Sequence, residues 1–300
     1  GWTNTSGTPL SATVQRHQLL VDGSSADTIT STDTWSYAGT VTNSGKTYSV
    51  YNSTTSQSQI IVDSAVKTNL IPGVNLVDVA AGAGGFVING ASAGDGAGFV
   101  VSNVGDVNGD GYDDVLVGAP FADNISATDS GRAYVVFGKS TTVAVELSTL
   151  GTNGFVINGL SESTATQYWM GTGLGAAGDV NGDGLADILV GSTKDGGGGR
   201  TFVIYGQTSS TAVEVSAVAA GSTNGFVINA LSANDNSGTF VSSAGDVNGD
   251  GFADLLVGSS LADPVVSNAG AAYVVFGKAV NASVELSNLG ARGFAINGMN

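Results

Sequence analysis

The stretch GDVNGDGYDD at residues 105–114 returns as GDVNGDGLAD at 178–187 and as GDVNGDGFAD at 245–254. Each copy places oxygen-bearing side chains at its second, fourth, sixth and tenth letters, and its last Asp begins an apolar segment that reads DVLVGAP, DILVGST or DLLVGSS. A turn rich in Asp and Gly that runs into an apolar segment is typical of the connection between two strands. The chain is therefore expected to repeat one hairpin three times.

A second motif sets the length of the repeat. GFVING begins at residues 85 and 154, GFVINA at 225 and GFAING at 293, so the copies are 69, 71 and 68 residues apart. The apolar runs at 115–117 and 134–137 predict strands packed on both faces, and each unit has room for about four strands. This period matches a propeller blade. Tandem β-sandwich domains are the alternative, but each unit is too small for two full sheets.

Composition narrows the class of protein. Hydrophobic residues make up 42% of the 300 residues, which is enough for a core, and 46 Gly with few charges favour short strands joined by tight turns. The formal net charge of −16 would repel nucleic acid and anionic membrane surfaces. The chain has no Cys for disulfides or thiolate metal sites, and it has no apolar run of about 18 residues that could cross a membrane. We expect an all-β fold without nucleic-acid binding or membrane insertion.

The repeats divide the chain. Residues 1–72 lack the period and carry strand-like segments such as HQLLVDG, TYSVYNS and SQIIVDS, which predict a small N-terminal β module with a join near 71–73. Residues 73–300 hold three four-stranded blades, at about 85–153, 154–224 and 225–292, plus the start of a fourth. These blades are expected to be incomplete or part of a larger propeller. The opening GWTNTSG, without Met, leads us to expect an excised piece of a longer polypeptide that continues past Asn300.

The repeated stretch has the spacing of a calcium loop. Ca²⁺ takes about six to eight oxygen ligands, and a short loop supplies them from alternate positions with a Gly at position 6 for the sharp turn. Side chains at positions 1, 3, 5 and 9 and the carbonyl at position 7 are the predicted ligands. These are Asp106, Asn108, Asp110, Tyr112 and Asp114 in the first loop, Asp179, Asn181, Asp183, Leu185 and Asp187 in the second, and Asp246, Asn248, Asp250, Phe252 and Asp254 in the third.

The alternatives to three Ca²⁺ sites are weaker. An EF-hand needs a Glu at position 12, where these loops have Val117, Val190 and Val257 inside an apolar segment. A turn capped by its own Asx side chains without metal is the other possibility. The chain has 21 Asp against 4 Glu, and nine of the Asp occupy the repeated loop positions, where they would repel one another without a cation. Three Ca²⁺ sites are the favoured interpretation.

The segment GFVVSNVGDVNGDGYDDVLVGAP at residues 98–120 resembles the FG-GAP repeats of integrin alpha-chain propellers and their bacterial relatives. The resemblance covers about residues 75–300. It implies blades whose first hairpin holds Ca²⁺, in an extracellular adhesion or recognition protein. The chain departs from the family at strand ends, because GAP becomes GST at 191–193 and GSS at 258–260, and YWMGTG at 168–173 replaces the expected FG. None of these departures changes a predicted ligand.

The N-terminal segments from LLVDGSSADTIT to SQIIVDSAV resemble the tail of a module found in very large bacterial surface or type I secreted proteins. No motif predicts catalysis. GASAG at 90–94 is a repeat loop, GLGAAG at 173–178 runs into an Asp-rich turn where a nucleotide-binding helix would begin, and His17 is the only His. We therefore expect a protein that is not an enzyme.

The leading hypothesis is an extracellular, secreted or cell-surface module in which Ca²⁺ stiffens β-blades used for adhesion to a protein or glycan ligand. The loops at 119–131, 192–199 and 259–270 differ among the units and lie on the rim opposite the Asp loops, so the ligand is expected there. A carbohydrate-binding accessory domain of a secreted enzyme is one alternative. A structural polymer, in which further copies of the chain complete one another's strand edges, is the other.

Overall fold

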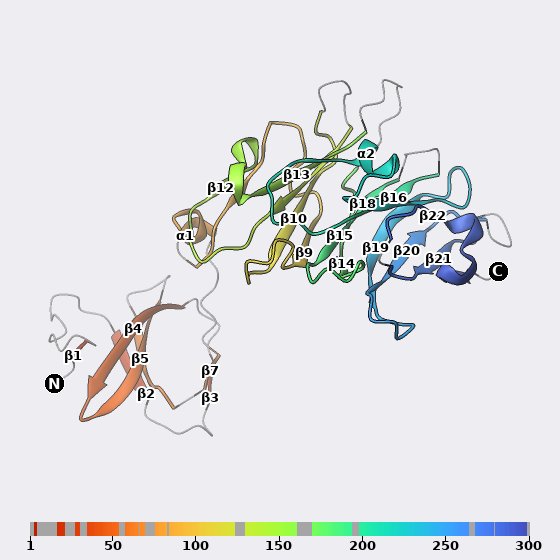
Figure 1. The fold of residues 1–300 in the computed structure, drawn as a ribbon. Helices are drawn as coiled ribbons and strands as arrows, with labels where there is room; N and C mark the ends of the chain where they lie inside the picture. The colour runs from red at the N-terminus through yellow and green to blue at the C-terminus, as the bar shows by residue number, and fades with distance from the viewer. Residues whose placement is uncertain are drawn as a thin grey trace. The chain divides into compact units, whose positions relative to one another are not determined.

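The computed structural model describes residues 3–4, 17–21, 28–30, 35–53, 58–65, 67–69, 76–82, 84–123, 130–160, 170–193, 198–263, 268–278 and 280–298. They form two compact units, residues 1–84 and 85–300 (Figure 1). The join expected at 71–73 lies outside the described residues. Each unit is described by itself below.

The N-terminal unit is built on one sheet of five strands in the order β1-β4-β5-β6-β2. Trp35 and Val62 pack on one side of this sheet, and Val41 and Ile61 belong to a second small cluster. A separate pair of short parallel strands and one short helix complete the unit. The bounds are β1 Thr3–Asn4, β2 His17–Val21, β3 Thr28–Thr30, β4 Trp35–Asn43, β5 Lys46–Ser53, β6 Ser58–Asp63, β7 Lys67–Asn69 and α1 Leu76–Ala80.

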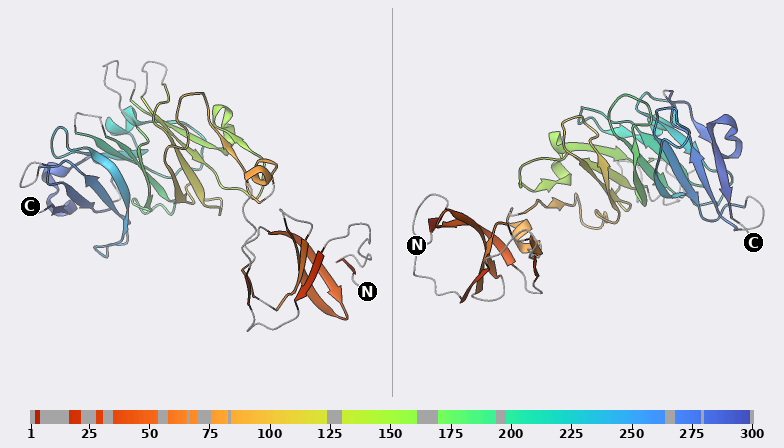
Figure 2. Two further views of the ribbon diagram at one scale, coloured as in Figure 1. Left: turned by 180° about the vertical axis from the view of Figure 1, so that it is seen from behind. Right: turned by 90° about the horizontal axis from the view of Figure 1, so that it is seen from below.

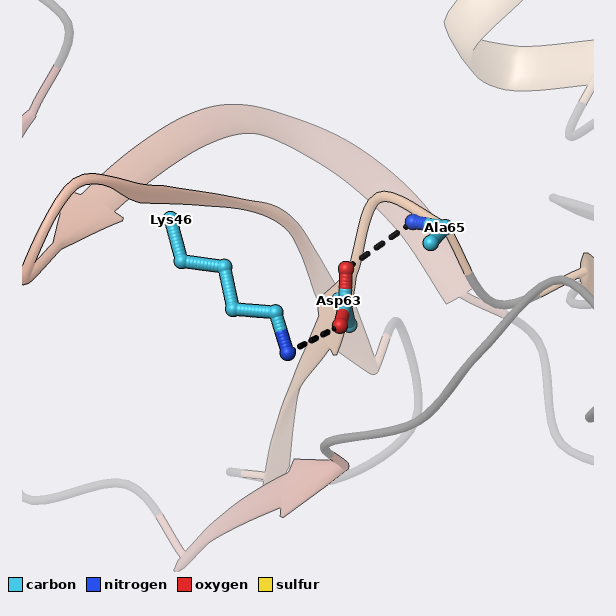
Figure 3. A network of polar contacts seen from close by, with 3 residues as sticks. All are labelled: Lys46, Asp63 and Ala65. Atoms are coloured by element: carbon cyan, nitrogen blue, oxygen red, sulfur yellow. Dashed lines mark hydrogen bonds and ion pairs between the residues drawn. The ribbon is translucent and has the colours of Figure 1, made fainter.

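The hairpin β4–β5 turns at Ser44 and Gly45, both with positive φ. Two positive φ values are what a two-residue hairpin of right-handed twist needs. Beyond the turn, Lys46 Nζ lies 2.5 Å from Oδ2 of the buried Asp63, whose Oδ1 accepts the Ala65 N–H at 2.9 Å (Figure 3). This ion pair joins the start of β5 to the end of β6.

In the described residues, the second unit is built on three sheets that each have a core of four antiparallel strands, which confirms the expected all-β, blade-like fold. Their apolar strands are buried on both faces, as the continuous runs predicted. The first sheet has β9 Val101–Gly105, β10 Asp114–Ala119, β11 Arg132–Val136 and β13 Gly154–Asn158. The second has β14 Gly173–Gly178, β15 Asp187–Ser192, β16 Arg200–Ile204 and β18 Gly225–Asn229, and the third has β19 Ser237–Gly245, β20 Asp254–Ser259, β21 Ala271–Val275 and β23 Gly293–Asn297.

Each sheet ends with the GFxIN strand that begins the next repeat in the sequence, so the sheets are out of phase with the repeats expected at 85–153, 154–224 and 225–292. The Val-Glu dipeptide of each repeat forms a two-residue strand that pairs in parallel with the preceding GFxIN strand. The short strands are β12 Val145–Glu146, β17 Val213–Glu214 and β22 Val284–Glu285. They pair with β8 Ile88–Asn89, with β13 and with β18, respectively. A helical turn follows each one, with α2 Val215–Ala219 in the second repeat and 3₁₀ turns in the others.

The three sheets lie side by side, with their first strands β9, β14 and β19 adjacent (Figures 1 and 2). Two apolar cores fill the seams between them. Leu116, Phe155 and Ile157 of the first sheet meet Ile188 and Phe202 of the second. In the next seam, Phe226 and Ile228 meet Leu255 and Tyr273. Burial in the seams therefore comes from neighbouring repeats rather than from within one sheet, as in a repeat protein.

Candidate metal-binding loops

The three Asp-rich loops connect the first two strands of the three sheets, β9 to β10, β14 to β15 and β19 to β20. In each case the pairing of the two strands shifts register next to the loop, at Asp114, Asp187 and Asp254. The loops therefore occupy equivalent places in the three sheets. The sequence placed the loops at the first hairpin of each unit, and in the structure the predicted residues lie in these loops.

Inside the first loop, side-chain oxygens accept peptide N–H groups of the same loop. Asp106 Oδ1 accepts from Gly109 at 2.7 Å and from Asp110 at 3.1 Å, and its Oδ2 accepts from Gly111 at 2.8 Å. Asn108 Oδ1 accepts from Asp110 at 2.8 Å, and Asp110 Oδ1 accepts from Tyr112 at 2.9 Å. The other two loops repeat all five bonds with distances that agree within 0.1 Å.

The Gly at position 6 of each loop has a positive φ, +88° at Gly111, +88° at Gly184 and +92° at Gly251. L-residues rarely adopt this conformation, because their Cβ clashes with the backbone there. The expectation that Gly permits the sharp turn is therefore confirmed at all three positions.

The Asp at position 9 is fully buried and accepts two peptide N–H groups, one from its own loop and one from just after the third strand of its sheet. Asp114 accepts the Val107 N–H at 2.9 Å and the Gly138 N–H at 2.7 Å. Asp187 does the same with Val180 and Gly206, both at 2.8 Å, and Asp254 with Val247 and Gly277. Each carboxylate thus ties the loop to the residue that follows the third strand of its sheet. The sequence had suggested a metal ligand here and gave no sign of this second role.

The glycines that reach these carboxylates were also missed. A Cβ at Gly138 would lie 2.3 Å from the Asp113 carbonyl oxygen, and one at Gly277 would lie 2.4 Å from the Ala253 carbonyl oxygen. Only glycine leaves room for the peptide N–H to approach the buried Asp at these positions. The recurring Phe-Gly or Tyr-Gly after the third strand, at 137–138, 205–206 and 276–277, was the available signal.

The loops concentrate negative charge. Burial raises the pKa of Asp187 to about 7, backbone hydrogen bonds from Gly206 and Val180 oppose that rise, and the carboxylates of Asp183 and Asp179 add to it. Burial likewise raises the pKa of Asp114. Burial and the nearby carboxylates of Asp187 and Asp183 raise the pKa of Tyr205 to about 12. The partly buried carboxylates of the second loop therefore repel one another, and a bound cation would reduce that repulsion.

The donor set fits a hard cation in type. A carboxylate oxygen has about two lone pairs, so Asp106 Oδ2, both oxygens of Asp110 and both of Asp114 keep acceptor capacity after the hydrogen bonds above. In the part of the chain that the structure describes, however, no group of three His, Cys, Asp or Glu side chains converges as a ready metal cage. The oxygens of Asp106, Asn108 and Asp110 belong to one turn, while Asp114 is held by backbone amides.

Neighbouring loops contact one another across the seams. The Ala186 N–H donates to the Asp106 carbonyl at 3.0 Å, and the Ala253 N–H donates to the Asp179 carbonyl at 2.9 Å. The position-7 side chain of one loop also lies against the position-4 Gly of the loop before it, so that a Cβ at Gly182 would lie 2.8 Å from Cε1 of Phe252. From the sequence, only the backbone carbonyl of position 7 was given a role, as a metal ligand. The structure shows that the position-7 side chain also packs against the neighbouring loop.

Two open depressions lie near the seam between the second and third repeats. One, of about 380 Å³, borders the second loop and is lined by Asn181, Asp183, Tyr205, Gly206, Gln207, Thr223 and Asn224. The other, of about 350 Å³, is lined by Gly198, Gly199, Arg200, Asn229, Ala230, Ser232 and Ala233, where β16 begins and β18 ends. None of the helices in the described part of the chain has the length and apolar composition needed to cross a bilayer.

Known proteins share this repeat. The FG-GAP repeat model matches residues 97–136, 170–204 and 237–275, which contain the first three strands of each sheet. Integrin alpha-7 of Mus musculus is 32% identical over 160 residues, which is 53% of this chain and 12% of that protein. Integrin alpha-PS2 of Drosophila melanogaster is 34% identical over 122 residues, which is 39% of this chain and 8% of that protein. The chain thus spans only a small part of the length of these relatives, and it contains three FG-GAP repeats as found in integrin alpha chains.

Proposed function

We propose that the chain is an extracellular module of a secreted or cell-surface protein, in which Ca²⁺ held by the three Asp loops stiffens the blades for adhesion or recognition. The observation that carries this proposal is the threefold recurrence of one loop with the same donor atoms and the same hydrogen bonds. Integrin alpha relatives share these repeats. The segments of residues 1–72 lead us to propose a large bacterial surface or secreted protein as the source.

The bound cation would act on structure rather than on chemistry. Asp106, Asn108, Asp110, the Tyr112 carbonyl and Asp114 would hold it in the first loop, and the corresponding residues would do so in the other loops. Because each loop contacts the next through a peptide hydrogen bond, filling the loops would stiffen the seams as well as the hairpins. Weak sites with dissociation constants of about 10⁻⁴–10⁻³ M would be filled outside the cell and empty in the cytosol.

A protein or glycan ligand is proposed for the rim opposite the loops. The central parts of the variable loops, 124–129, 194–197 and 264–267, lie outside the described residues. The lining of the depression around Arg200 and Asn229 also includes Ser232, and these polar residues suit a hydrogen-bonding ligand. We propose no catalysis for this rim.

Calorimetric titration of chelator-treated protein with Ca²⁺ tests the metal proposal. The native chain is expected to bind about three ions per molecule, and Asp110→Ala to bind about two, because it removes one ligand carboxylate from the first loop. Asp113→Ala is the matched control. Asp113 lies in the same loop, but the other loops have Ala186 and Ala253 there, so the substitution should leave the stoichiometry at three. Absence of Ca²⁺ binding by the native chain would refute the proposal.

A further inference from the structure

The seam between the second and third sheets contains four buried hydroxyl groups near the rim opposite the Asp loops. Ser237 begins β19 and Ser259 ends β20, whereas the third Asp loop joins the other ends of these two strands. Thr201, Ser237 and Ser259 are 0% exposed, and Tyr273 is 2% exposed. Among the described residues, none of the four hydroxyl oxygens has a hydrogen-bond partner. A buried hydroxyl without a partner costs free energy, so these groups need one.

The strand register brings the four groups to one end of the seam. Ser237 pairs with Ser259 across β19 and β20. Tyr273 lies two residues beyond the partner of Ser259 on β21, so both side chains extend from the same face of the third sheet, which packs against the second sheet. A Cβ on Gly238, the residue after Ser237, would lie 2.9 Å from Oγ1 of Thr201 on the second sheet. Hydroxyls of both sheets therefore meet at this end of the seam.

A buried carboxylate lies beside these hydroxyls. Asp235 is 1% exposed, and its Oδ2 accepts the Ser232 N–H at 2.7 Å. The Leu261 N–H donates to the Asp235 carbonyl at 3.1 Å, which holds this residue beside the end of β20. Burial raises the pKa of the Tyr273 phenol, and the charge of the nearby Asp235 adds to that rise. Within the described residues Asp235 belongs to no ion pair, and burial of a carboxylate is costly unless a positive charge balances it.

The seam between the first and second sheets is closed by apolar side chains at the same end. The equivalents of Thr201, Ser237 and Tyr273 there belong to the apolar core of that seam, and they are Ala133, Met170 and Phe202. Ser259 alone keeps a polar equivalent, Ser192. Three of the four hydroxyls are therefore not needed to pack a seam of this kind.

A surface depression gives this end of the seam a route to solvent. The depression of about 350 Å³ around Arg200 is lined by Ser232, whose N–H donates to Asp235, and by Gly198. The Gly198 carbonyl accepts the Ser237 N–H at 2.9 Å. The depression therefore borders the segments that carry the buried oxygens, which gives a small ion a short path from solvent.

We propose that the seam site, defined as Thr201, Asp235, Ser237, Ser259 and Tyr273, binds a monovalent alkali cation such as Na⁺. Carboxylate and hydroxyl oxygens are the ligands that hard cations prefer, and each hydroxyl keeps lone pairs to offer. One positive charge balances the single carboxylate, whereas a divalent ion would leave a net charge buried in the seam. A water molecule would satisfy the hydroxyls but would leave the carboxylate unbalanced. The bound ion would join the second sheet to the third, away from the Asp loops.

Thermal unfolding in different salts tests the seam site. The full chain is melted in sodium, potassium and choline chloride at equal ionic strength and constant Ca²⁺, so that screening and the state of the Asp loops are the same in all three. An ion that binds only the folded chain raises the melting temperature by about 2–4 °C at roughly ten times its dissociation constant. We expect a saturable rise of this size in sodium or potassium relative to choline, whose quaternary ammonium group is too large for the seam.

Two variants and a matched control assign the effect to the seam site. Asp235→Asn should remove the difference between the salts, and Thr201→Val, which keeps the side-chain shape, should reduce it, whatever either does to absolute stability. Asp95→Asn removes the same charge from the equivalent position of the first unit, where two Ala replace the two Ser, and should retain the difference. Broadening of the sodium NMR signal by the native chain should fall in Asp235→Asn and persist in Asp95→Asn.

Two results would overturn the proposal. Equal melting temperatures of the native chain in all three salts would show that water alone satisfies the hydroxyls. A difference between the salts that Asp235→Asn retains in full would place the ion elsewhere on the chain.

Discussion

The last Asp of each loop acts through both of its oxygens. The Asp114 carboxylate accepts one N–H from inside its loop and one from Gly138, 24 residues further along the chain. Because the group is fully buried, an oxygen replaced by an amide NH₂ would face a peptide N–H with no acceptor between them. These two hydrogen bonds are formed between protein atoms alone and tie the loop to the chain after β11.

Asp114→Asn is therefore expected to reduce the free energy of unfolding by about 1–3 kcal/mol even in chelator, the cost of leaving a buried donor without an acceptor. Asp113→Asn, at the exposed residue beside it, should change stability by less than about 0.5 kcal/mol. Urea unfolding of both variants in chelator measures the difference. Equal stabilities would show that the backbone bonds of Asp114 contribute nothing measurable.

At the scale of elements, the short Val-Glu strands hold one sheet to the next. Asn229 ends β18 of the second sheet and Glu285 lies on β22, which follows β21 of the third sheet, and their side chains meet at 2.6 Å. A double-mutant cycle of Asn229→Ala and Glu285→Ala should give a coupling energy of about 0.5–1 kcal/mol, as partly exposed charge-assisted hydrogen bonds do. Asn158→Ala combined with Glu285→Ala is the control and should be additive, because Asn158 bonds to Glu214 instead. Coupling in the control pair of equal size would contradict this assignment.

Some of these elements could be predicted from the sequence, and others could not. The loops, their glycines and the apolar strands were predictable because turn chemistry and strand burial are encoded within about ten neighbouring residues. The pairing of Val-Glu with the preceding GFxIN strand was not, since Val145 and Ile88 are 57 residues apart and two-residue strands leave no periodic pattern. The bond from Gly138 to Asp114 was missed for the same reason. The metal ligands stay a prediction, because the same side-chain oxygens accept hydrogen bonds from backbone N–H groups of the folded loop.

At the scale of the whole molecule, stability resides in the seams. Ile228 is fully buried between the second and third sheets, so Ile228→Ala should cost about 2–5 kcal/mol through lost contacts and the cavity left behind. Ile296→Ala removes the same atoms at the equivalent position of β23, where the side chain is 54% exposed, and should cost less than about 1 kcal/mol in dilute solution. Denaturation of the two variants side by side measures the contrast. Equal losses would mean that the seams do not carry the stability.

Thermal unfolding with and without Ca²⁺ tests the central claim, that the three loops are structural calcium sites, most directly. An ion present at a hundred times its dissociation constant adds about 2.7 kcal/mol per site. The native chain should therefore melt at a clearly higher temperature in Ca²⁺ than in chelator. The triple variant Asp110→Ala, Asp183→Ala and Asp250→Ala, which removes one ligand from every loop, should melt at nearly the same temperature in both. A native chain whose melting temperature is unchanged by saturating Ca²⁺ would contradict the claim.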